Sequence, residues 1–263
     1  GRLIAIGSVT SLTVYSLLWF FIEFFQASFL INFLVSGGIC LGLAIFMGMY
    51  FPSFEEKSQQ NKSIVLRKRY WLYYLLTFLS GARRQIFVVF AAFLMVEKFG
   101  YSVSEVTLLF LVNYAFNWLF AEKIGQLIGR IGERRALTLE YTGLIFVFVA
   151  YGLVENATLA ACLYVIDHMF FALAIGIKTY FQKIADPADM ASSAGVSFTI
   201  NHIAAVVIPA ALGLVWLWSH ALVFYFGAMF ALLSLIASQL IPRDPMQGKE
   251  TNLTSANSLG YQA

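Results

Sequence analysis

Long apolar stretches, separated by short polar segments, follow one another along the whole chain. A transmembrane helix needs roughly 20 consecutive apolar residues, and none of the stretches has the period-two alternation of barrel strands. Because backbone groups in hydrocarbon must be hydrogen-bonded internally, the stretches are predicted to be helices. The pattern predicts an all-α, polytopic membrane protein with about eight transmembrane helices, near residues 3–22, 28–51, 71–96, 104–121, 136–154, 158–182, 191–215 and 221–241.

The composition agrees with lipid as the main solvent. Of the 263 residues, 60% are hydrophobic and 12% are charged, whereas a typical soluble domain has about 25% charged residues. A chain with so little charge cannot cover a water-facing surface, which excludes a soluble enzyme.

Neither a cofactor nor a metal ion is predicted. The sequence has no Cys-x-x-Cys pair and no group of Cys and His residues at metal-ligand spacing. It also has no phosphate-cradling loop and no Ser/His/Asp arrangement, and its basic loops lack the aromatic residues of nucleic-acid binders. We therefore expect no enzymatic activity, no catalytic residue, no cofactor and no nucleic-acid partner.

Positive charges are divided unevenly between the two sets of loops. One set contains a single basic residue, Lys98. The positive-inside rule places the more basic set in the cytoplasm, so both termini are expected there, in a bacterial inner (plasma) membrane. The basic residues of that set are Arg2, Lys57, Lys62, Arg67, Lys68, Arg69, Lys123, Arg130, Arg134, Arg135, Lys183, Arg243 and Lys249.

A polar, basic segment, Ser53–Arg69, is the longest internal interruption of the apolar pattern. It divides the chain into two transmembrane helices (residues 1–52), a cytoplasmic loop (53–70) and six further helices (71–242). The remaining residues, 243–263, are polar and are expected to form a disordered cytoplasmic tail.

The segment between the fourth and fifth predicted helices carries a recognisable motif. It reads Gly125-Gln-Leu-Ile-Gly-Arg-Ile-Gly-Glu-Arg-Arg135. This resembles the G-x-L-x-D-R-x-G-R-R loop of the major facilitator superfamily of transporters, which joins helices 2 and 3 and recurs in weaker form between helices 8 and 9. The residues that carry the resemblance are Gly125, Arg130, Gly132, Arg134 and Arg135.

The resemblance implies two six-helix bundles, each built from inverted three-helix repeats around a site at the membrane midplane. Residues 71–242 would then match the second bundle, with the motif between family helices 8 and 9. The segment Ser53–Arg69 would then be the central loop that joins the two bundles. The two helices before this central loop would match family helices 5 and 6, and the first four family helices would be missing.

The motif also has a physical rationale. Glycines let helix ends turn and approach closely, and cations there can bond the terminal carbonyls of neighbouring helices. We expect Gly125, Arg130 and Gly132 to form a tight cytoplasmic turn. Gly129 stands where the family has an acidic residue, and Glu133 where it has a basic one, so the family's charge network cannot form unchanged. A generic basic loop is the alternative interpretation.

Ionisable residues inside transmembrane helices are costly and indicate functional sites. In the third predicted helix, Arg84 shares a face with Ser80 and Gly81, whereas Arg83 shares a face with large apolar residues. We therefore expect Arg84 to face the interior of the bundle, and Arg83 to snorkel or to contact another helix.

The sixth predicted helix carries Asp167 and Lys178 on one stripe, with His168 beside Asp167. Asp167 is expected to lie near Arg84, directly or through water, or to form a proton-handling couple with His168. A static ion pair that fixes helix packing is the alternative.

Amide side chains are the other polar groups in the predicted membrane region. Asn113 and Asn117 share a face of the fourth helix, and Asn201 lies on the seventh. They either contact a solute or hydrogen-bond a neighbouring helix.

Two functions remain open on this basis. The first is a secondary transporter, gradient-driven or facilitative, of the major facilitator type, for a small anionic or zwitterionic solute. Eight helices cannot enclose a two-sided pathway, so this function needs missing N-terminal helices or a second membrane chain. The second is a non-transporting membrane subunit or scaffold, derived from half a transporter fold, that binds partner helices. The candidate solute or proton-coupling residues are Arg84, Asp167, His168, Lys178, Asn113, Asn117 and Asn201.

Overall fold

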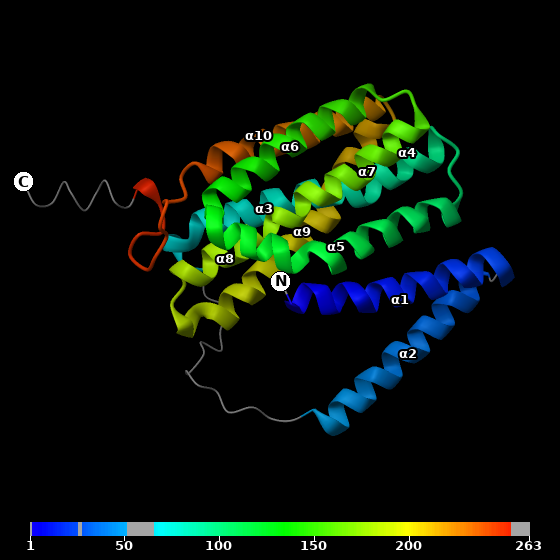
Figure 1. The fold of residues 1–263 in the computed structure, drawn as a ribbon, viewed down its shortest axis with the longest axis horizontal. Helices are drawn as coiled ribbons and strands as arrows, with labels where there is room; N and C mark the ends of the chain where they lie inside the picture. Colours follow the sequence, from blue (N-terminus) through cyan, green and yellow to red (C-terminus); the bar gives the residue numbers. More distant parts are fainter. Residues whose placement is uncertain (1, 26–27, 52–65, 254–263) are drawn as a thin grey trace, which may run out of the picture.

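The structure is a computed structural model that describes residues 2–25, 28–51 and 66–253. Regular secondary structure in this part of the chain is helical throughout (Figure 1). Eight of its helical spans are long and apolar enough to cross a membrane. This confirms the prediction of an all-α, polytopic membrane protein.

In chain order the helices are α1 (Arg2–Phe25), α2 (Phe29–Tyr50), η1 (Lys68–Tyr70), α3 (Trp71–Gln85), η2 (Ile86–Ala91), α4 (Ala92–Glu97), α5 (Val103–Ile131), α6 (Glu133–Leu153), α7 (Ala157–Phe171), η3 (Ala172–Ala174), α8 (Ile175–Ile184), η4 (Pro187–Asp189), α9 (Met190–Trp216) and α10 (His220–Ser238). From η1 to α10 the helices follow one another with short connections.

Helix boundaries coincide with capping residues. Ser102 and Glu105 form a reciprocal capping box at the start of α5, which satisfies two backbone N–H groups that have no partner within the helix. Asn156 accepts a hydrogen bond from the backbone N–H of Leu159 at the start of α7. Gly132, with a φ of +84°, ends α5 and begins α6. Other residues seldom adopt this left-handed backbone conformation.

Two of the spans change their helical winding part-way along. The third span contains the π-helix η2 between α3 and α4, and the sixth contains the 3-10 turn η3 between α7 and α8. Neither segment contains a proline. Both irregularities lie well inside their spans, Lys68–Glu97 and Ala157–Ile184, and such irregularities are frequent at functional sites.

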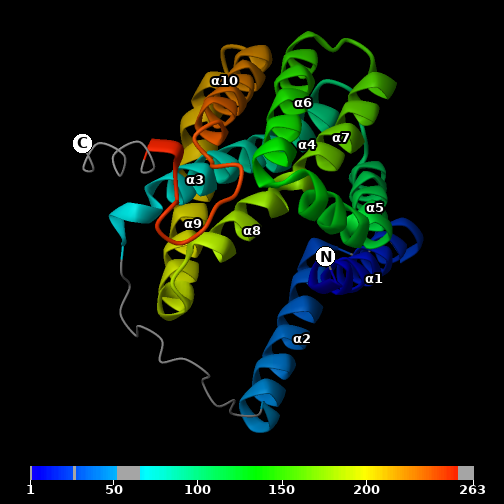
Figure 2. The same cartoon turned by 60° about the vertical axis from the view of Figure 1, so that its left-hand side comes forward.

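The last six spans form one bundle. Helix α6 packs along α10, α3 packs against α9 and α10, and α7 packs against α5 and α6 (Figure 2). Gly227 of α10 permits a close approach to α6, because a Cβ atom there would lie 2.8 Å from the ring of Phe148. Small residues at helix crossings are typical of membrane bundles, in which packing rather than the hydrophobic effect drives association.

The first two spans lie outside this bundle. Helix α1 packs against α5, where the ring of Tyr15 stacks on Phe110 and Tyr114 with centroid distances of 5.6 and 5.1 Å. The Ser104 hydroxyl also donates a 2.6 Å hydrogen bond to Glu23. Helix α2 leans away from the bundle (Figures 1 and 2), and nearly all its described side chains are exposed.

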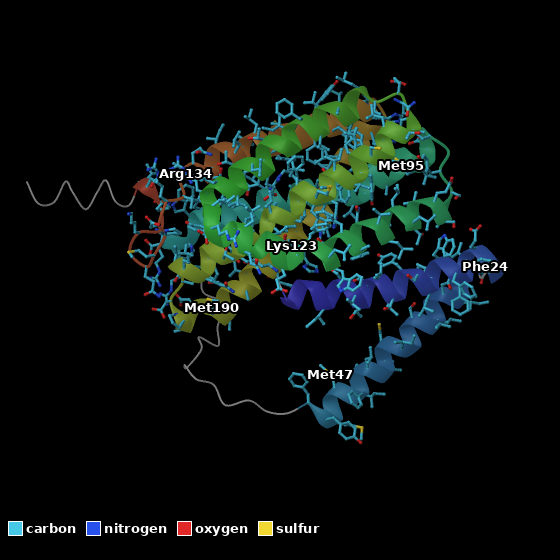
Figure 3. The ribbon with its side chains drawn as sticks, viewed as in Figure 1. Phe24, Met47, Met95, Lys123, Arg134 and Met190 are labelled. Atoms are coloured by element: carbon cyan, nitrogen blue, oxygen red, sulfur yellow. The ribbon has the colours of Figure 1, made fainter. Side chains whose placement is uncertain are left out.

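The loops lie at two opposite ends of the bundle. Arg134 and Met190 are at one end and Met95 is at the other (Figure 3). At the second end, the amine of Lys98 contacts Glu155 at 3.0 Å. This agrees with the predicted division of the loops into two sets, while the membrane side that each set faces stays a prediction.

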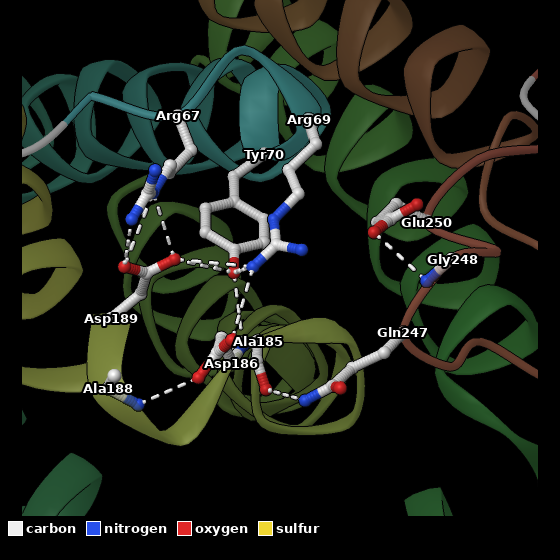
Figure 4. A network of polar contacts seen from close by, with 10 residues as sticks. All are labelled: Arg67, Arg69, Tyr70, Ala185, Asp186, Ala188, Asp189, Gln247, Gly248 and Glu250. Atoms are coloured by element: carbon white, nitrogen blue, oxygen red, sulfur yellow. Dashed lines mark hydrogen bonds and ion pairs between the residues drawn. The ribbon is translucent and has the colours of Figure 1, made fainter.

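A buried carboxylate joins two segments at the first end. Asp189, which is 2% exposed, accepts hydrogen bonds from Arg67, Arg69 and the hydroxyl of Tyr70 (Figure 4). The hydrogen bond from Arg67 raises the pKa of that guanidinium above its ordinary value. The network fixes the start of the third span to the connection between α8 and α9.

The segment after α10 differs from the expected disordered tail. Tyr180 donates a 2.6 Å hydrogen bond to the backbone carbonyl of Glu250, and Gln247 donates one of 2.7 Å to the carbonyl of Ala185. Glu250 is 4% exposed. The structure differs from the prediction at residues 243–253, because side chains of this segment bond to backbone carbonyls at helix ends and the Tyr180 side chain of α8 bonds to its backbone. Residues 254–263 lie outside the described part of the chain.

Candidate functional site

A buried ion pair lies within the bundle, between the third and fifth spans. Arg83 of α3 contacts Glu140 of α6, with 3.3 Å between Nη1 and Oε1, and the two side chains are 1% and 0% exposed. The guanidinium also lies over the ring of Tyr141, 4.4 Å from its centroid. Its Nε donates a 3.3 Å hydrogen bond to the carbonyl of Leu79, one turn earlier.

A second carboxylate belongs to the same region. Asp167 of α7 is 1% exposed and interacts electrostatically with Arg83 and Glu140. Neither oxygen of Asp167 has a hydrogen-bond partner among the described residues, and the same is true of Oε2 of Glu140 and Nη2 of Arg83. We call Arg83, Glu140 and Asp167 the buried triad.

Of the two neighbouring arginines, Arg83 contacts another helix, which is one of its two expected positions, whereas Arg84 does not lie in the interior of the bundle as expected. Arg83 is buried, whereas Arg84 is exposed on the surface of the bundle. Arg84 lies on the same face of α3 as Gly81, as expected. At Gly81 this face packs on α9, because a Cβ atom on Gly81 would lie 2.8 Å from Oδ1 of Asn201. The cation that interacts electrostatically with Asp167 is therefore Arg83. No direct pair between Asp167 and Arg84 is formed among the described side chains, and a pairing through water stays a prediction.

Arg84 belongs to a different polar group. It interacts electrostatically with His168 of α7, and Nε2 of His168 lies 2.8 Å from the amide nitrogen of Asn117 of α5. Asn201 of α9 lies beside Gly81, one turn before Arg84 in α3. We call Arg84, His168, Asn117 and Asn201 together the polar band. No described residue forms a hydrogen bond or an ion pair with Arg84.

Asp167 and His168 lie in separate groups despite being adjacent. Asp167 interacts with the buried triad, and His168 with the polar band. Consecutive helical residues point in directions roughly 100° apart, which explains the separation. The expected proton-handling couple between the two is therefore not formed.

The other predicted site residues lie in mixed surroundings. Asn113 is 2% exposed, and neither of its amide atoms has a partner among the described residues. The amide of Asn201 donates to the carbonyl of Ser197 in its own helix at 2.9 Å, rather than to a neighbouring helix. Lys178 is exposed, since η3 interrupts the helix and with it the stripe that was expected to join Lys178 to Asp167.

The loop motif is more helical than expected. Gly125 and Arg130 lie within α5, so Gly132 alone forms the turn. Arg134 donates hydrogen bonds of 3.1 and 3.3 Å to the side-chain oxygen of Gln239 after α10. Arg135 is exposed. Through Arg134, the motif thus links the start of α6 to the end of α10. It does not form the tight turn of several residues that was expected.

Glu140 is the functional candidate that the sequence reasoning missed. It is the sole charged residue of the apolar stretch 136–154, and that isolation was a usable signal, because an ionisable group inside a membrane needs a partner.

Comparison with known proteins gives no assignment: no protein-family model matches the chain, and none of the curated proteins matches it.

Proposed function

We propose that this chain is part of a secondary transporter of the major facilitator type, for a small anionic or zwitterionic solute, in a bacterial inner membrane with both termini in the cytoplasm. The observation that carries the proposal is Arg84. It is the seventeenth residue of the 30-residue span Lys68–Glu97, and it is exposed. A cation facing hydrocarbon at this depth costs at least about 2.5 kcal/mol, so this face borders water or another protein surface.

The contacts of the bundle support the inverted repeats of such a transporter. Let the third, fourth and fifth spans, which begin with η1–α3, α5 and α6, correspond in that order to the sixth, seventh and eighth, which begin with α7, η4–α9 and α10. The packing of α3 on α9 then corresponds to that of α7 on α5. The packing of α3 on α10 corresponds to that of α7 on α6, and the contact of α6 with α10 corresponds to itself. The irregular spans also correspond, since η2 and η3 lie in the first span of each triplet. Broken helices at the repeat interface are typical of transporter binding sites.

The position of α1 supports a second bundle. It packs against α5, which contributes Asn117 to the polar band. A helix from before the central loop therefore contacts the six-helix bundle next to the proposed pathway. Further helices, from this protein or from another chain, would complete the opposite wall of that pathway.

Asp167 is our candidate for coupling transport to a proton gradient. The buried triad has two carboxyl groups and one guanidinium, so it is neutral when one carboxyl group holds a proton. Asp167→Asn would then abolish gradient-driven uptake and leave solute exchange intact. Uptake that continues at the wild-type rate in Asp167→Asn would rule out this role.

The solute proposal is tested on the protein reconstituted in liposomes. Small carboxylates, phosphate and amino acids are added one at a time, and the transport current is recorded on a solid-supported membrane. A solute that gives a current with the wild type is expected to give none with Arg84→Gln and a reduced one with Arg84→Lys, which retains the charge. An unchanged current in Arg84→Gln would refute the assignment of Arg84.

The alternative, a non-transporting subunit, would cover the same face with a partner helix. Thiol labelling separates the two functions. In a chain with Cys40→Ser and Cys162→Ser, a cysteine is introduced by Asn201→Cys and treated with a water-soluble thiol reagent. Labelling supports an aqueous pathway, whereas complete protection in the native membrane supports a partner helix.

A further inference from the structure

A cavity of about 820 Å³ lies at the end of the bundle that carries the Gly132 turn. Its walls come from the end of α5, the first turns of α6, the last turn of α8 and the segment after α10. It is separate from the polar band and from the buried triad, none of whose residues line it.

The lining of this cavity is predominantly cationic. Lys183 is already neutralised by Glu133, with 2.7 Å between Nζ and Oε1, and Asp244 adds one further negative charge. Four arginines also line the cavity. Arg134 donates hydrogen bonds to the side chain of Gln239, and the other three have no hydrogen-bond or ion-pair partner among the described residues. They are Arg130, Arg135 and Arg243.

The cavity continues from this cationic rim along a membrane-spanning helix. Arg135, Thr138, Leu139 and Thr142 all line it, and their three- and four-residue spacing places them on one face of α6. From Arg135 to Thr142 the helix rises about 10 Å. Leu139 is 50% exposed, so the apolar part of the groove is open to the surrounding medium, which for this span is lipid.

We propose that this cavity binds a phosphate-bearing anion, with the phosphate held by Arg130, Arg135 and Arg243. Guanidinium groups bind phosphate oxygens through charge-assisted, often bidentate hydrogen bonds. The order of charge and apolar surface along α6 matches the headgroup and the first acyl carbons of an anionic phospholipid. Anionic lipids are also enriched at the cytoplasmic leaflet, the side predicted for these loops. The site goes beyond the proposed transport function, since it lies outside the pathway residues.

Gly129, which also lines the cavity, offers a matched pair of test variants. A Cβ atom at Gly129 would meet nothing within 4 Å, so a larger side chain fits there. Gly129→Asp adds a negative charge to the rim, and Gly129→Asn adds the same shape without charge. Asp and Asn have similar helix propensities, so a difference between the two variants reports charge alone.

The experiment measures the thermal unfolding midpoint of the purified full chain in detergent, followed by intrinsic tryptophan fluorescence. The probes are phosphatidylglycerol, phosphatidylcholine and inorganic phosphate, each added at rising concentration, and apparent dissociation constants follow from the shifts of the midpoint. We expect phosphatidylglycerol to bind more tightly than phosphatidylcholine. Gly129→Asp should weaken its binding about fivefold, the effect of one charge near a membrane surface, and Gly129→Asn should leave it unchanged.

A second pair of variants repeats the test at positions other than Gly129. Arg135→Gln should also weaken phosphatidylglycerol binding about fivefold, whereas Lys123→Gln, an exposed cation outside the cavity, should not. Stabilisation by inorganic phosphate alone, lost in Gly129→Asp, would identify a soluble phosphate as the ligand and would still support the site. Equal binding of both lipids with no effect of phosphate, or equal losses in Gly129→Asp and Gly129→Asn, would overturn the proposal.

Discussion

The buried triad makes a quantitative prediction about stability. Arg83→Met removes the only guanidinium that contacts Glu140 in the described chain and leaves two buried carboxylates without a cation. Removing one partner of a buried ion pair typically costs about 3–5 kcal/mol. The loss of the contact with the ring of Tyr141 adds about 0.5–2 kcal/mol. We therefore expect Arg83→Met to destabilise the bundle by at least about 3 kcal/mol.

Removing the charge of Glu140 instead of that of Arg83 should destabilise the bundle less. Glu140→Gln leaves Arg83 with Asp167 as an electrostatic partner, and the amide oxygen of glutamine can still accept a hydrogen bond. The double change to Arg83→Met with Glu140→Met replaces the pair by apolar side chains. Such replacements are often neutral or stabilising, so the double variant should be more stable than Arg83→Met alone. Glu140→Met alone completes the double-mutant cycle, which gives the coupling energy of the pair.

The assay is the unfolding free energy in mixed micelles with a rising fraction of denaturing detergent. Arg84→Met is the matched control, because Arg84 is exposed and has no ion pair among the described residues, and it should change the stability by no more than about 0.5 kcal/mol. Two results would refute the reasoning: Arg83→Met as stable as Arg84→Met, or a larger loss in Glu140→Gln than in Arg83→Met.

Three shorter predictions concern the ends of the bundle. Gly132→Ala forces a Cβ atom into a left-handed backbone conformation and should cost about 1–2 kcal/mol in the same assay; no loss would mean that the turn relaxes freely. Asp189→Ala leaves Tyr70 and two arginines without their shared acceptor, so proteolysis between α8 and α9 should accelerate, and an unchanged rate would contradict this. A cysteine from Glu155→Cys should react with an impermeant reagent outside intact cells, and one from Lys249→Cys should not; the opposite result would reverse the predicted topology.

Helix number was predictable from the sequence because it depends on local hydropathy. The eight apolar stretches all recur as helical spans. Their ends were less predictable. The apolar stretch of the fourth helix stops near residue 121, but α5 continues to Ile131, since polar residues remain helical beyond the hydrocarbon. The π-helix η2 also has no local signal, because its sequence, IFVVFA, contains neither glycine nor proline.

The candidate site was predictable in its composition but not in its arrangement. The polar band contains four of the residues that the sequence predicts as site residues, namely Arg84, Asn117, His168 and Asn201. The buried triad contains only one of them, Asp167. Its other members were missed because their burial is decided by a contact between α3 and α6, residues that are 57 positions apart.

The positions of Arg83 and Arg84 show why periodicity could not decide which of the two is buried. Periodicity identifies the buried face of a helix when the other face meets a different medium. Helix α3 packs on α9 and α10, and its Arg83 meets α6, so both the apolar stripe that contains Arg83 and the small-residue stripe that contains Gly81 are buried. Periodicity therefore does not distinguish the two stripes, and the burial of each guanidinium depends on which neighbour can neutralise it. Glu140 supplies that charge to Arg83 alone, and Arg84 is left on the face where the proposed solute would bind.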